Sequence, residues 1–308
     1  MKVLVTGGAG FIGRWVVKRL LSSDYNVIAY DNLSSGSLAN INEFLKNKCF
    51  KFVKGDVLDV RKMKKVFEDV DICVHLAAQI NVQKSIEDPE ETFRVNVIGT
   101  HNVLEECRRR DAKLVLVGTC LVYDTSLGKP ISENHPVKPA SPYASSKLAG
   151  EELALSYFRA YGLPVVVTRP FNTYGPFQRS DSEGGVVSIF IKRKLEKKPL
   201  LVFGDGEQTR DLLYVEDCAD FIVRAMESRR AVGEIINAGT GRDVSINELA
   251  LMICGNNKMI KHVKHPHPQA EIRKLVCDFS KARKLLGWKP AISLEEGIKK
   301  TEQWLAGA

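Results

Sequence analysis

The sequence lacks the features that mark several large classes of protein. No apolar run reaches the roughly 18 residues that a membrane-spanning helix needs, and the N-terminal residues do not follow the order of a secretory signal peptide. The 7 cysteines are an odd number and form no C-x-x-C pair, which argues against a disulfide framework and against a zinc site. We therefore expect a cytoplasmic protein with free thiols, without bound metal and without membrane association.

The chain also lacks a recognisable nucleic-acid-binding module. Its formal net charge of +8 comes mainly from short basic clusters at residues 61–65, 108–110 and 192–198, and no aromatic residues are interleaved with them. Clusters of this kind are usually solvated helix faces, so we expect no nucleic acid as a partner. The same positive field would tolerate a polyanionic small substrate.

Short apolar runs alternate with amphipathic segments of helical length along the first 170 residues. Runs rich in valine, isoleucine and leucine are typical of buried parallel strands, and we expect such strands at residues 2–6, 26–31, 49–56, 71–78, 113–119 and 164–170. The segments of helical length lie at residues 12–23, 61–70, 88–110 and 141–162. Strand alternating with helix predicts an α/β fold with a doubly wound parallel sheet.

Glycine recurs at every third position in TGGAGFIG, at Gly7, Gly10 and Gly13, between the first expected strand and the first expected helix. In that context the missing side chains let a dinucleotide pyrophosphate approach the start of the helix. Asp31 ends the next expected strand, where a carboxylate binds the adenosine ribose hydroxyls and repels a 2′-phosphate. The pattern predicts NAD rather than NADP. The alternative is a tight strand–helix turn, with Asp31 as a cap.

After Pro170 the alternation gives way to loops rich in glycine, proline and serine and to shorter elements. A chain of 308 residues suits one large domain or two that pack closely. We therefore expect a Rossmann domain at residues 1–170, which also includes about 212–238, and a smaller α/β substrate-binding lobe within 171–308.

Tyr143 and Lys147 lie four residues apart in an expected helix, so their side chains share one face. A tyrosine acts as a base at neutral pH only if its pKa falls by roughly three units, and a neighbouring lysine and a positively charged nicotinamide can together lower it. Thr119 ends the strand expected at 113–119, and its hydroxyl could bind the same substrate oxygen. A solvent-exposed helix pair is the alternative for Tyr143 and Lys147.

At this point the chain resembles the extended short-chain dehydrogenase/reductase family, in particular its nucleotide-sugar epimerases and dehydratases, among them the UDP-glucose 4-epimerases. The similar motifs occur in order over essentially the whole chain. They are TGGAGFIG (6–13), DNLSSG (31–36), GDV (55–57), HLAA (75–78), NVIGT (96–100), GTCLVYD (118–124), SPYASSK (141–147), RPFNTYGP (169–176), FGDGEQTRDLLYVEDCA (203–219) and SKARKLLGWKP (280–290).

The resemblance implies roles for individual residues. The NAD-binding residues that it implies are Gly7, Gly10, Phe11, Ile12, Gly13, Asp31, Asn32, Ser34, Asp56, Val57, Leu76, Ala77, Ala78, Asn96, Tyr143, Lys147 and Pro170. The implied catalytic residues are Thr119, Tyr143 and Lys147. The implied substrate-binding residues are Thr119, Cys120, Tyr143, Asn172, Val187, Phe203, Arg210 and Arg273, with Asn172 and Arg210 at the diphosphate and Phe203 beside the base. For Arg210, a surface salt bridge with Asp211 or Asp205 is the alternative.

The chain departs from the family pattern just after Thr119. The 4,6-dehydratases carry Asp-Glu there, because elimination needs a base and an acid, whereas this chain has Cys120 and Leu121. A 4-epimerase needs neither carboxylate. We therefore expect a nucleotide-diphosphate sugar, of the UDP-glucose/UDP-galactose or UDP-N-acetylhexosamine type, to be epimerised at C4 through a transient 4-keto intermediate.

Two alternatives remain open. A thiol can act as an acid or a base when its surroundings tune it, so Cys120 could serve a dehydratase or a C3/C5 epimerase, although a packing cysteine is the simpler interpretation. A non-catalytic NAD-binding regulator would keep the same fold. Two further departures are Asp124, where a glycine is usual, and Pro268, where a substrate-binding arginine is expected and Arg273 or a histidine could substitute.

The resemblance also implies a homodimer, because the helices expected at 88–110 and 141–162 resemble the two that form a four-helix dimer interface in this family. We expect solution scattering at micromolar concentration to report twice the mass of one chain. A monomer mass under those conditions would contradict this prediction.

Overall fold

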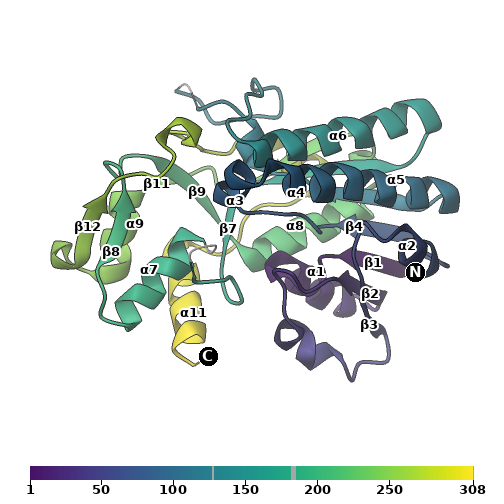
Figure 1. Ribbon diagram of the computed structural model, residues 1–308, viewed down its shortest axis with the longest axis horizontal. Coiled ribbons are helices and arrows are strands. Elements are labelled where there is room, and N and C mark those ends of the chain that lie inside the picture. Colours follow the sequence, from purple (N-terminus) through teal and green to yellow (C-terminus); the bar gives the residue numbers. More distant parts are fainter. Residues whose placement is uncertain (127, 182–184, 308) are drawn as a thin grey trace.

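The computed structural model of the protein describes residues 1–126, 128–181 and 185–307 (Figure 1). Its largest element is a seven-stranded sheet in the order β10-β6-β5-β4-β1-β2-β3, in which all neighbouring strands are parallel. The strands are β1 (Lys2–Thr6), β2 (Asn26–Asp31), β3 (Phe50–Lys54), β4 (Ile72–His75), β5 (Lys113–Val117), β6 (Val165–Pro170) and β10 (Ile235–Ala238). All six expected strands are present, and the predicted doubly wound α/β fold is confirmed.

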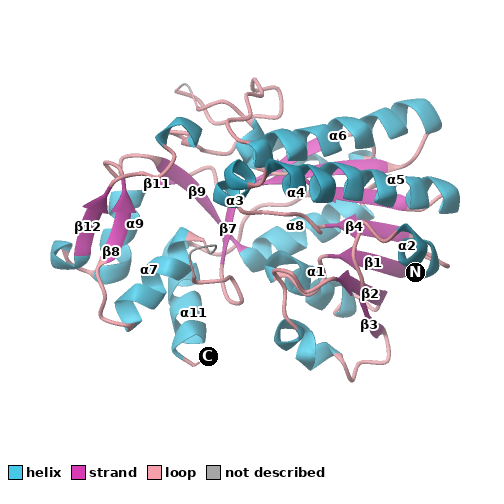
Figure 2. Ribbon diagram, viewed as in Figure 1, coloured by secondary structure: helices cyan, strands magenta, loops and turns pink. Residues whose placement is uncertain are grey.

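Both faces of this sheet are buried, which explains why its strands are continuously apolar. Val3 and Val5 pack with α1 and α8 on one face, whereas Leu4 packs with α2, α5 and α6 on the other (Figure 2). The covering helices are α1 (Phe11–Leu21), α2 (Val60–Val66), α5 (Gly99–Arg110), α6 (Pro142–Tyr161) and α8 (Val215–Glu227).

The prediction of a single helix at residues 88–110 is wrong. The chain instead forms α4 (Pro89–Phe93), one π-helical turn (Arg94–Ile98) and α5, and the short helix α3 (Val82–Glu87) precedes them. The wider turn contains Asn96, whose buried amide bonds the backbone of Gln79 in both directions, at 2.8 and 3.0 Å. Such turns often occur at functional sites, and here the turn brings Asn96 beside the loop that follows β4.

The second lobe contains two small sheets and its own apolar core. One sheet has the order β11-β9-β7 and the other pairs β12 with β8. The elements are β7 (Asn172–Tyr174), α7 (Val186–Leu195), β8 (Leu200–Phe203), β9 (Thr209–Tyr214), β11 (Asp243–Ser245), α9 (Ile246–Cys254), β12 (Ile260–Val263), α10 (Ser280–Leu286) and α11 (Leu294–Ala306). Although β10 follows β7, β8 and β9 in the chain, it joins the large sheet beside β6. The division of the chain at residue 170 stays a prediction.

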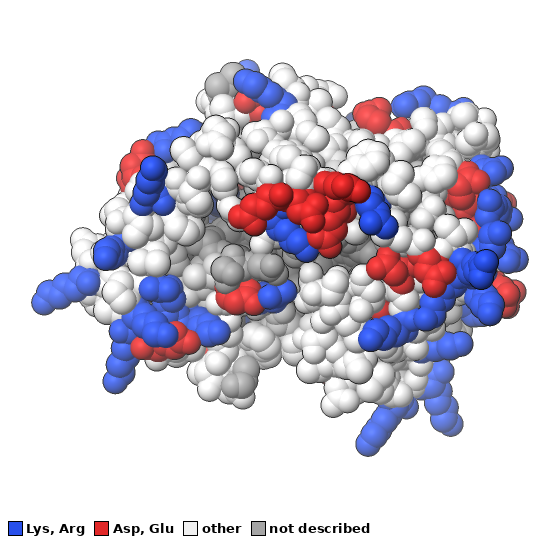
Figure 3. All heavy atoms as spheres, viewed as in Figure 1, with Lys and Arg blue, Asp and Glu red and all other residues white. Residues whose placement is uncertain are grey.

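Charge is unevenly spread over the face seen in Figure 3. Lysine and arginine side chains lie around the edge of this face, whereas acidic side chains gather at its centre, over α3 and α4. The segment over which they gather contains Glu87, Asp88, Glu90 and Glu91. Among the residues that the structure describes, no helix is both long enough and apolar enough to cross a membrane.

Candidate active site

The turn between β1 and α1 can exist only with glycine at its key positions. Gly7 has a φ of +70°, and a Cβ there would lie 2.9 Å from the backbone nitrogen of Ala77. A Cβ on Gly13 would collide with the carbonyl oxygen of Gly7. Gly10 is the N-cap of α1 and has no side chain that could accept a hydrogen bond. The first N–H groups of that helix therefore receive no side-chain cap. This turn fits the pyrophosphate of a dinucleotide.

Asp31 links the end of β2 to the glycine turn. Its carboxylate is 7% exposed and accepts hydrogen bonds from the backbone N–H groups of Ala9, at 3.0 Å, and Leu33, at 2.7 Å. Burial raises the pKa of Asp31, and bonds from the backbone of Leu33, Ala9 and Gly10 oppose that change. The carboxylate therefore caps the strand end, and the same position suits a ribose.

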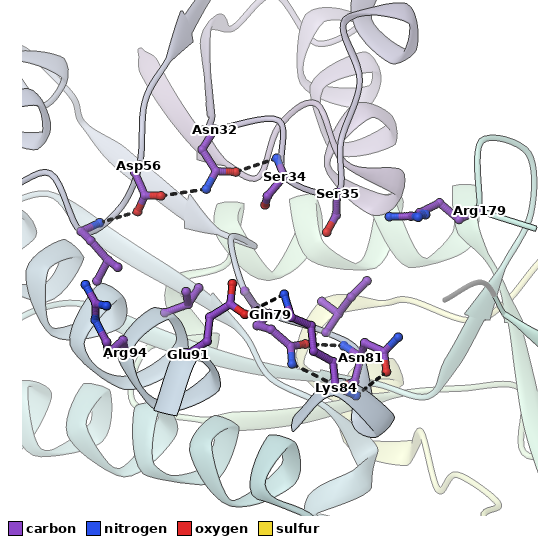
Figure 4. A pocket seen from close by; sticks show the side chains of 14 residues that line it. Asn32, Ser34, Ser35, Asp56, Gln79, Asn81, Lys84, Glu91, Arg94 and Arg179 are labelled. Carbon is purple, nitrogen blue, oxygen red and sulfur yellow. Dashed lines mark hydrogen bonds and ion pairs between the residues drawn. The ribbon is translucent and has the colours of Figure 1, made fainter. Parts of the chain in front are cut away.

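A cavity of about 270 Å³ opens beside Asn32, the residue that follows β2 (Figure 4). Asn32, Ser34 and Asp56 line one side of it, and the Asn32 amide donates to the Asp56 carboxylate at 2.8 Å. Ala78 and Gln79 line the cavity from the loop after β4. The structure thus brings predicted NAD-binding residues from three separate segments, Asn32 and Ser34, Asp56, and Ala78, to one cavity.

His75 at the end of β4 begins the motif HLAA, but the sequence analysis assigned it no role. The Thr100 hydroxyl donates to the Asn96 carbonyl at 2.6 Å, so it accepts from Nε2 of His75 at 3.1 Å. Nδ1 of His75 then accepts from the Thr6 hydroxyl at 2.7 Å. Burial, with the charge of Lys147, lowers the pKa of His75 to about 3, so the ring is neutral and fixes the strand end.

The predicted catalytic residues meet at the start of α6. Ser141 caps this helix by accepting from the Ala144 N–H at 3.2 Å, which starts the helix just before Tyr143. The side chain of Thr119 lies near enough to Tyr143 to lower the pKa of the phenol, and Lys147 Nζ donates to the Val117 carbonyl at 2.7 Å. The solvent-exposed alternative is wrong, because Tyr143 and Lys147 are only 8% and 7% exposed.

Burial dominates the electrostatics of this centre. It raises the pKa of Tyr143 to about 12, the side chain of Thr119 lowers it in part, and the charges of Cys120 and Glu151 raise it. Burial also lowers the pKa of Lys147 to about 8, and the charge of Glu151 opposes this change. The phenol is therefore protonated in the protein alone, and a nearby cation would be needed to make it a base.

Cys120 lies beside this centre at the start of a helical turn. It is 2% exposed, and burial raises its pKa to about 12, while the charge of Arg210 lowers it and that of Asp211 raises it. Its thiol is therefore protonated at neutral pH. The neighbouring Leu121 is half-buried and cannot titrate.

The second lobe presents two predicted substrate-binding residues with unused contact surface. Asn172 begins β7, and within the described residues its Oδ1 is buried without a hydrogen-bond partner. Phe203 is 46% exposed and makes an edge-to-face contact with His265 at 5.8 Å. Val187, in contrast, is fully buried in the apolar core of this lobe.

Neither alternative partner expected for Arg210 is correct, because Arg210 forms its ion pair with Glu271. Its Nη1 also donates to the carbonyls of Thr209 and Ile272, both at 2.8 Å, so the guanidinium is firmly held. Asp211 points elsewhere and accepts four hydrogen bonds, from the Thr240 hydroxyl and the backbone N–H groups of Thr240, Gly241 and Cys277.

The segment around Pro268 contributes Glu271, which pairs with Arg210, and His265, which forms a hydrogen bond with Glu271. His265 accepts from the His267 N–H at Nδ1, at 3.0 Å, so its Nε2 carries the proton that it donates to Glu271 at 2.7 Å. Arg273 instead forms an exposed ion pair with Asp205 at 2.9 Å. Arg273 and a histidine were the expected substitutes for the arginine that is missing at position 268. Of these, His265 contacts Glu271, the ion-pair partner of Arg210.

Two other predicted features have ordinary local partners. Asp124 accepts from the neighbouring Thr125 N–H at 2.8 Å and lies 3.6 Å from the ammonium of Lys138. Pro170 ends β6 and is buried.

Within residues 1–126, 128–181 and 185–307, no group of three His, Cys, Asp or Glu side chains is placed to hold a metal ion.

Comparison with known proteins places these features in a family. The family model described as GDP-mannose 4,6 dehydratase matches residues 4–301. The UDP-glucose 4-epimerase of Mycolicibacterium smegmatis is 39% identical over 99% of this chain and 98% of its own length.

Solved structures agree over the whole chain. The X-ray structure of Pal from Bacillus thuringiensis has a TM-score of 0.98 and 56% identity, and covers 100% of this chain and 99% of that one. The UDP-glucuronic acid 4-epimerase of Bacillus cereus, solved in complex with UDP-glucuronic acid and NAD, has a TM-score of 0.92 and 34% identity, with coverage of 100% and 99%. The cofactor in that structure is the one that the glycine turn and Asp31 predict.

The lowered pKa of Lys147 makes stability depend on pH. Because the group loses its proton near pH 8 in the folded protein and near 10.5 when unfolded, the unfolded chain binds more protons between these values. The contribution of Lys147 to the free energy of unfolding should therefore rise with pH across that window, by up to roughly 3 kcal/mol. Urea unfolding of the wild type and of Lys147→Met at pH 8 to 10.5 measures the difference, and parallel pH dependences would contradict the assignment.

Proposed function

The chain belongs to the GDP-mannose 4,6-dehydratase family of nucleotide-sugar enzymes, and we propose that it epimerises C4 of a nucleotide-diphosphate sugar with NAD as its cofactor. The observation that carries this proposal is the buried group of Thr119, Tyr143 and Lys147, beside which positions 120 and 121 hold cysteine and leucine. The group can accept the proton of a sugar hydroxyl while NAD would accept the hydride, and the next two positions lack the carboxylates with which dehydratases of this family eliminate water.

NAD, held at the glycine turn and Asp31, would supply reversible hydride transfer at C4. Tyr143 takes the proton of the C4 hydroxyl, and Thr119 orients that oxygen through its own hydroxyl. Lys147 supplies a positive charge on the same helix face that favours the phenolate, as the cationic nicotinamide ring does. Burial raises the pKa of Tyr143, and these two positive charges would oppose that effect.

Inversion requires the keto sugar to present its other face while the rest of the substrate stays bound. Arg210 is held by two carbonyls and Glu271, so it offers a preorganised guanidinium to a diphosphate. Asn172 and Phe203 offer a side-chain amide and an exposed ring from the same lobe. A grip on the nucleotide diphosphate alone leaves the sugar free to turn. Similarity to enzymes that are named for UDP-sugars supports UDP as the nucleotide.

The reaction is tested by incubating the protein with a panel of UDP, dTDP, GDP and CDP sugars and reading the products by proton NMR and mass. We expect an inverted C4 signal at unchanged mass for one class of sugar. Tyr143→Phe should lower this rate by about 10²–10⁴-fold, because the proton acceptor is lost. A product lighter by one water would contradict epimerisation. An undiminished biological effect of Tyr143→Phe would instead favour an NAD-binding regulator.

A second candidate, a dehydratase or C3/C5 epimerase, is supported by the position of Cys120. Its thiol is buried near Tyr143 and Arg210, where it could meet the sugar carbons next to C4. At C3 or C5, a base would remove a proton from carbon, and that base exchanges protons with the solvent. At C4, hydride transfer returns the same hydrogen to carbon.

The two candidates separate in D₂O. The 4-epimerase should give product without carbon-bound deuterium, and Cys120→Ser should keep kcat within about threefold of the wild type, because a serine hydroxyl fills the same buried position. Deuterium at C3 or C5, together with a loss of about 10²-fold or more in Cys120→Ser, would establish the thiol chemistry in its place.

A further inference from the structure

A buried carboxylate lies beneath the reaction centre. Glu151 follows Lys147 by one helical turn and Tyr143 by two turns on α6, so the three side chains follow one side of the helix. Glu151 is 0% exposed. A buried ionised carboxylate is costly unless its oxygens are paired, so its partners indicate what it is for.

One oxygen of Glu151 is paired with an arginine from the neighbouring strand. Arg169 of β6 donates to Oε2 from Nε at 2.9 Å and from Nη2 at 2.6 Å, and both side chains are almost fully buried. Arg169 is held in turn by the ring of Tyr123, which its guanidinium carbon faces at 4.7 Å. The arginine therefore fixes the position of the carboxylate.

The other oxygen faces the strand end that carries Thr119. Oε1 of Glu151 has no hydrogen-bond partner among the described residues, and a Cβ on Gly118 would collide with it. Burial raises the pKa of Glu151, whereas Arg169, the charge of Lys147 and the backbone N–H of Thr119 oppose that change. The corner at Gly118 and Thr119 thus rests directly on Glu151, and only a glycine leaves room for this contact.

The charge of Glu151 also acts on the residues above it. It favours the charged form of Lys147 and disfavours the phenolate of Tyr143. The neutral ring of His75 lies near Lys147, and Cys120 lies near Tyr143. Without the carboxylate, burial alone would act on Lys147, and the ammonium would lose its proton more readily.

We infer that Glu151 is a positioning residue of the reaction centre, whose carboxylate supports the Gly118–Thr119 corner and holds the ammonium of Lys147 in its charged form. The inference rests on the proposed oxidation at C4 for its role in catalysis, but not for its contacts. Glu151 is 0% exposed, so it offers no surface to a substrate or cofactor. It acts through Thr119, which orients the sugar oxygen, and through Lys147, which favours the phenolate.

The charge part of this inference needs no sugar to be tested. Lysines labelled with ¹³C at Cε are titrated by NMR in the full-length protein, with Lys147 assigned from its missing signal in Lys147→Arg. The midpoint of Lys147 should fall by roughly one pH unit in Glu151→Gln, because its counter-charge is gone. Glu152→Gln is the matched control, since Glu152 is the next residue of α6 and its side chain is 62% exposed. This control should leave the midpoint unchanged.

Removing Glu151 alone leaves Arg169 buried without its partner, which strongly destabilises a fold. The double variant Glu151→Gln with Arg169→Met removes both members of the ion pair and should show a smaller fall in the Lys147 midpoint than Glu151→Gln, because the loss of the Arg169 cation partly offsets the loss of the carboxylate. An unchanged midpoint in either folded variant would overturn the charge part of the inference. This result does not depend on which sugar the protein uses, so it is distinguishable from failure of the proposed function.

The support of the Thr119 corner is tested separately by Glu151→Asp, which keeps the charge but withdraws the carboxylate from Gly118. We expect kcat to fall by about tenfold or more with KM little changed, and the Lys147 midpoint to stay at its wild-type value. A wild-type kcat in Glu151→Asp would overturn this part. A purely structural role would instead lower stability while leaving the Lys147 midpoint of the Gln variants and the kcat of the Asp variant unchanged.

Discussion

Parallel pairing in one sheet is the constraint on which the site depends. Because neighbouring strands run in the same direction, their carboxyl ends lie along one edge, and residues far apart in the chain meet there. Thr6, Asp31 and His75 end β1, β2 and β4 at this edge, and Thr119 follows β5. The glycine turn after β1 then fits against Ala77 only because both strand ends are held at the same level.

The same edge is also dry, and this shapes its chemistry. Tyr143, Lys147, Cys120 and Glu151 are all almost fully buried, so each pKa is moved first by loss of water and only then by its neighbours. In such surroundings a single charge has a larger effect than it has in water. A cationic ring or a phosphate that enters the site therefore changes the protonation of groups that are inert in the protein alone.

Much of the fold could be predicted from local patterns. Six parallel strands, the glycine turn and the helix that begins at Ser141 and carries Tyr143 follow from apolar runs, glycine spacing and helix periodicity, because each depends on residues that are close in the chain. The strand β10 was not itself predicted, because it is short and follows an excursion into the second lobe, although residues of about 212–238 were expected to belong to the Rossmann domain. The periodicity of apolar residues predicts a helix here but not the π-helical turn at Arg94–Ile98, because one extra residue in a single turn changes that periodicity little.

The sequence by itself determined the class of fold, the family and the identity of the side chains that can do chemistry. Only the tertiary structure decided which of them are dry and which are paired. It pairs Arg210 with Glu271 rather than with its neighbour Asp211, whose carboxylate is already used by four donors. It also places Glu151 beneath Thr119, 32 positions away in the chain. Such contacts depend on burial and on the approach of distant segments, and no local pattern of residues records either.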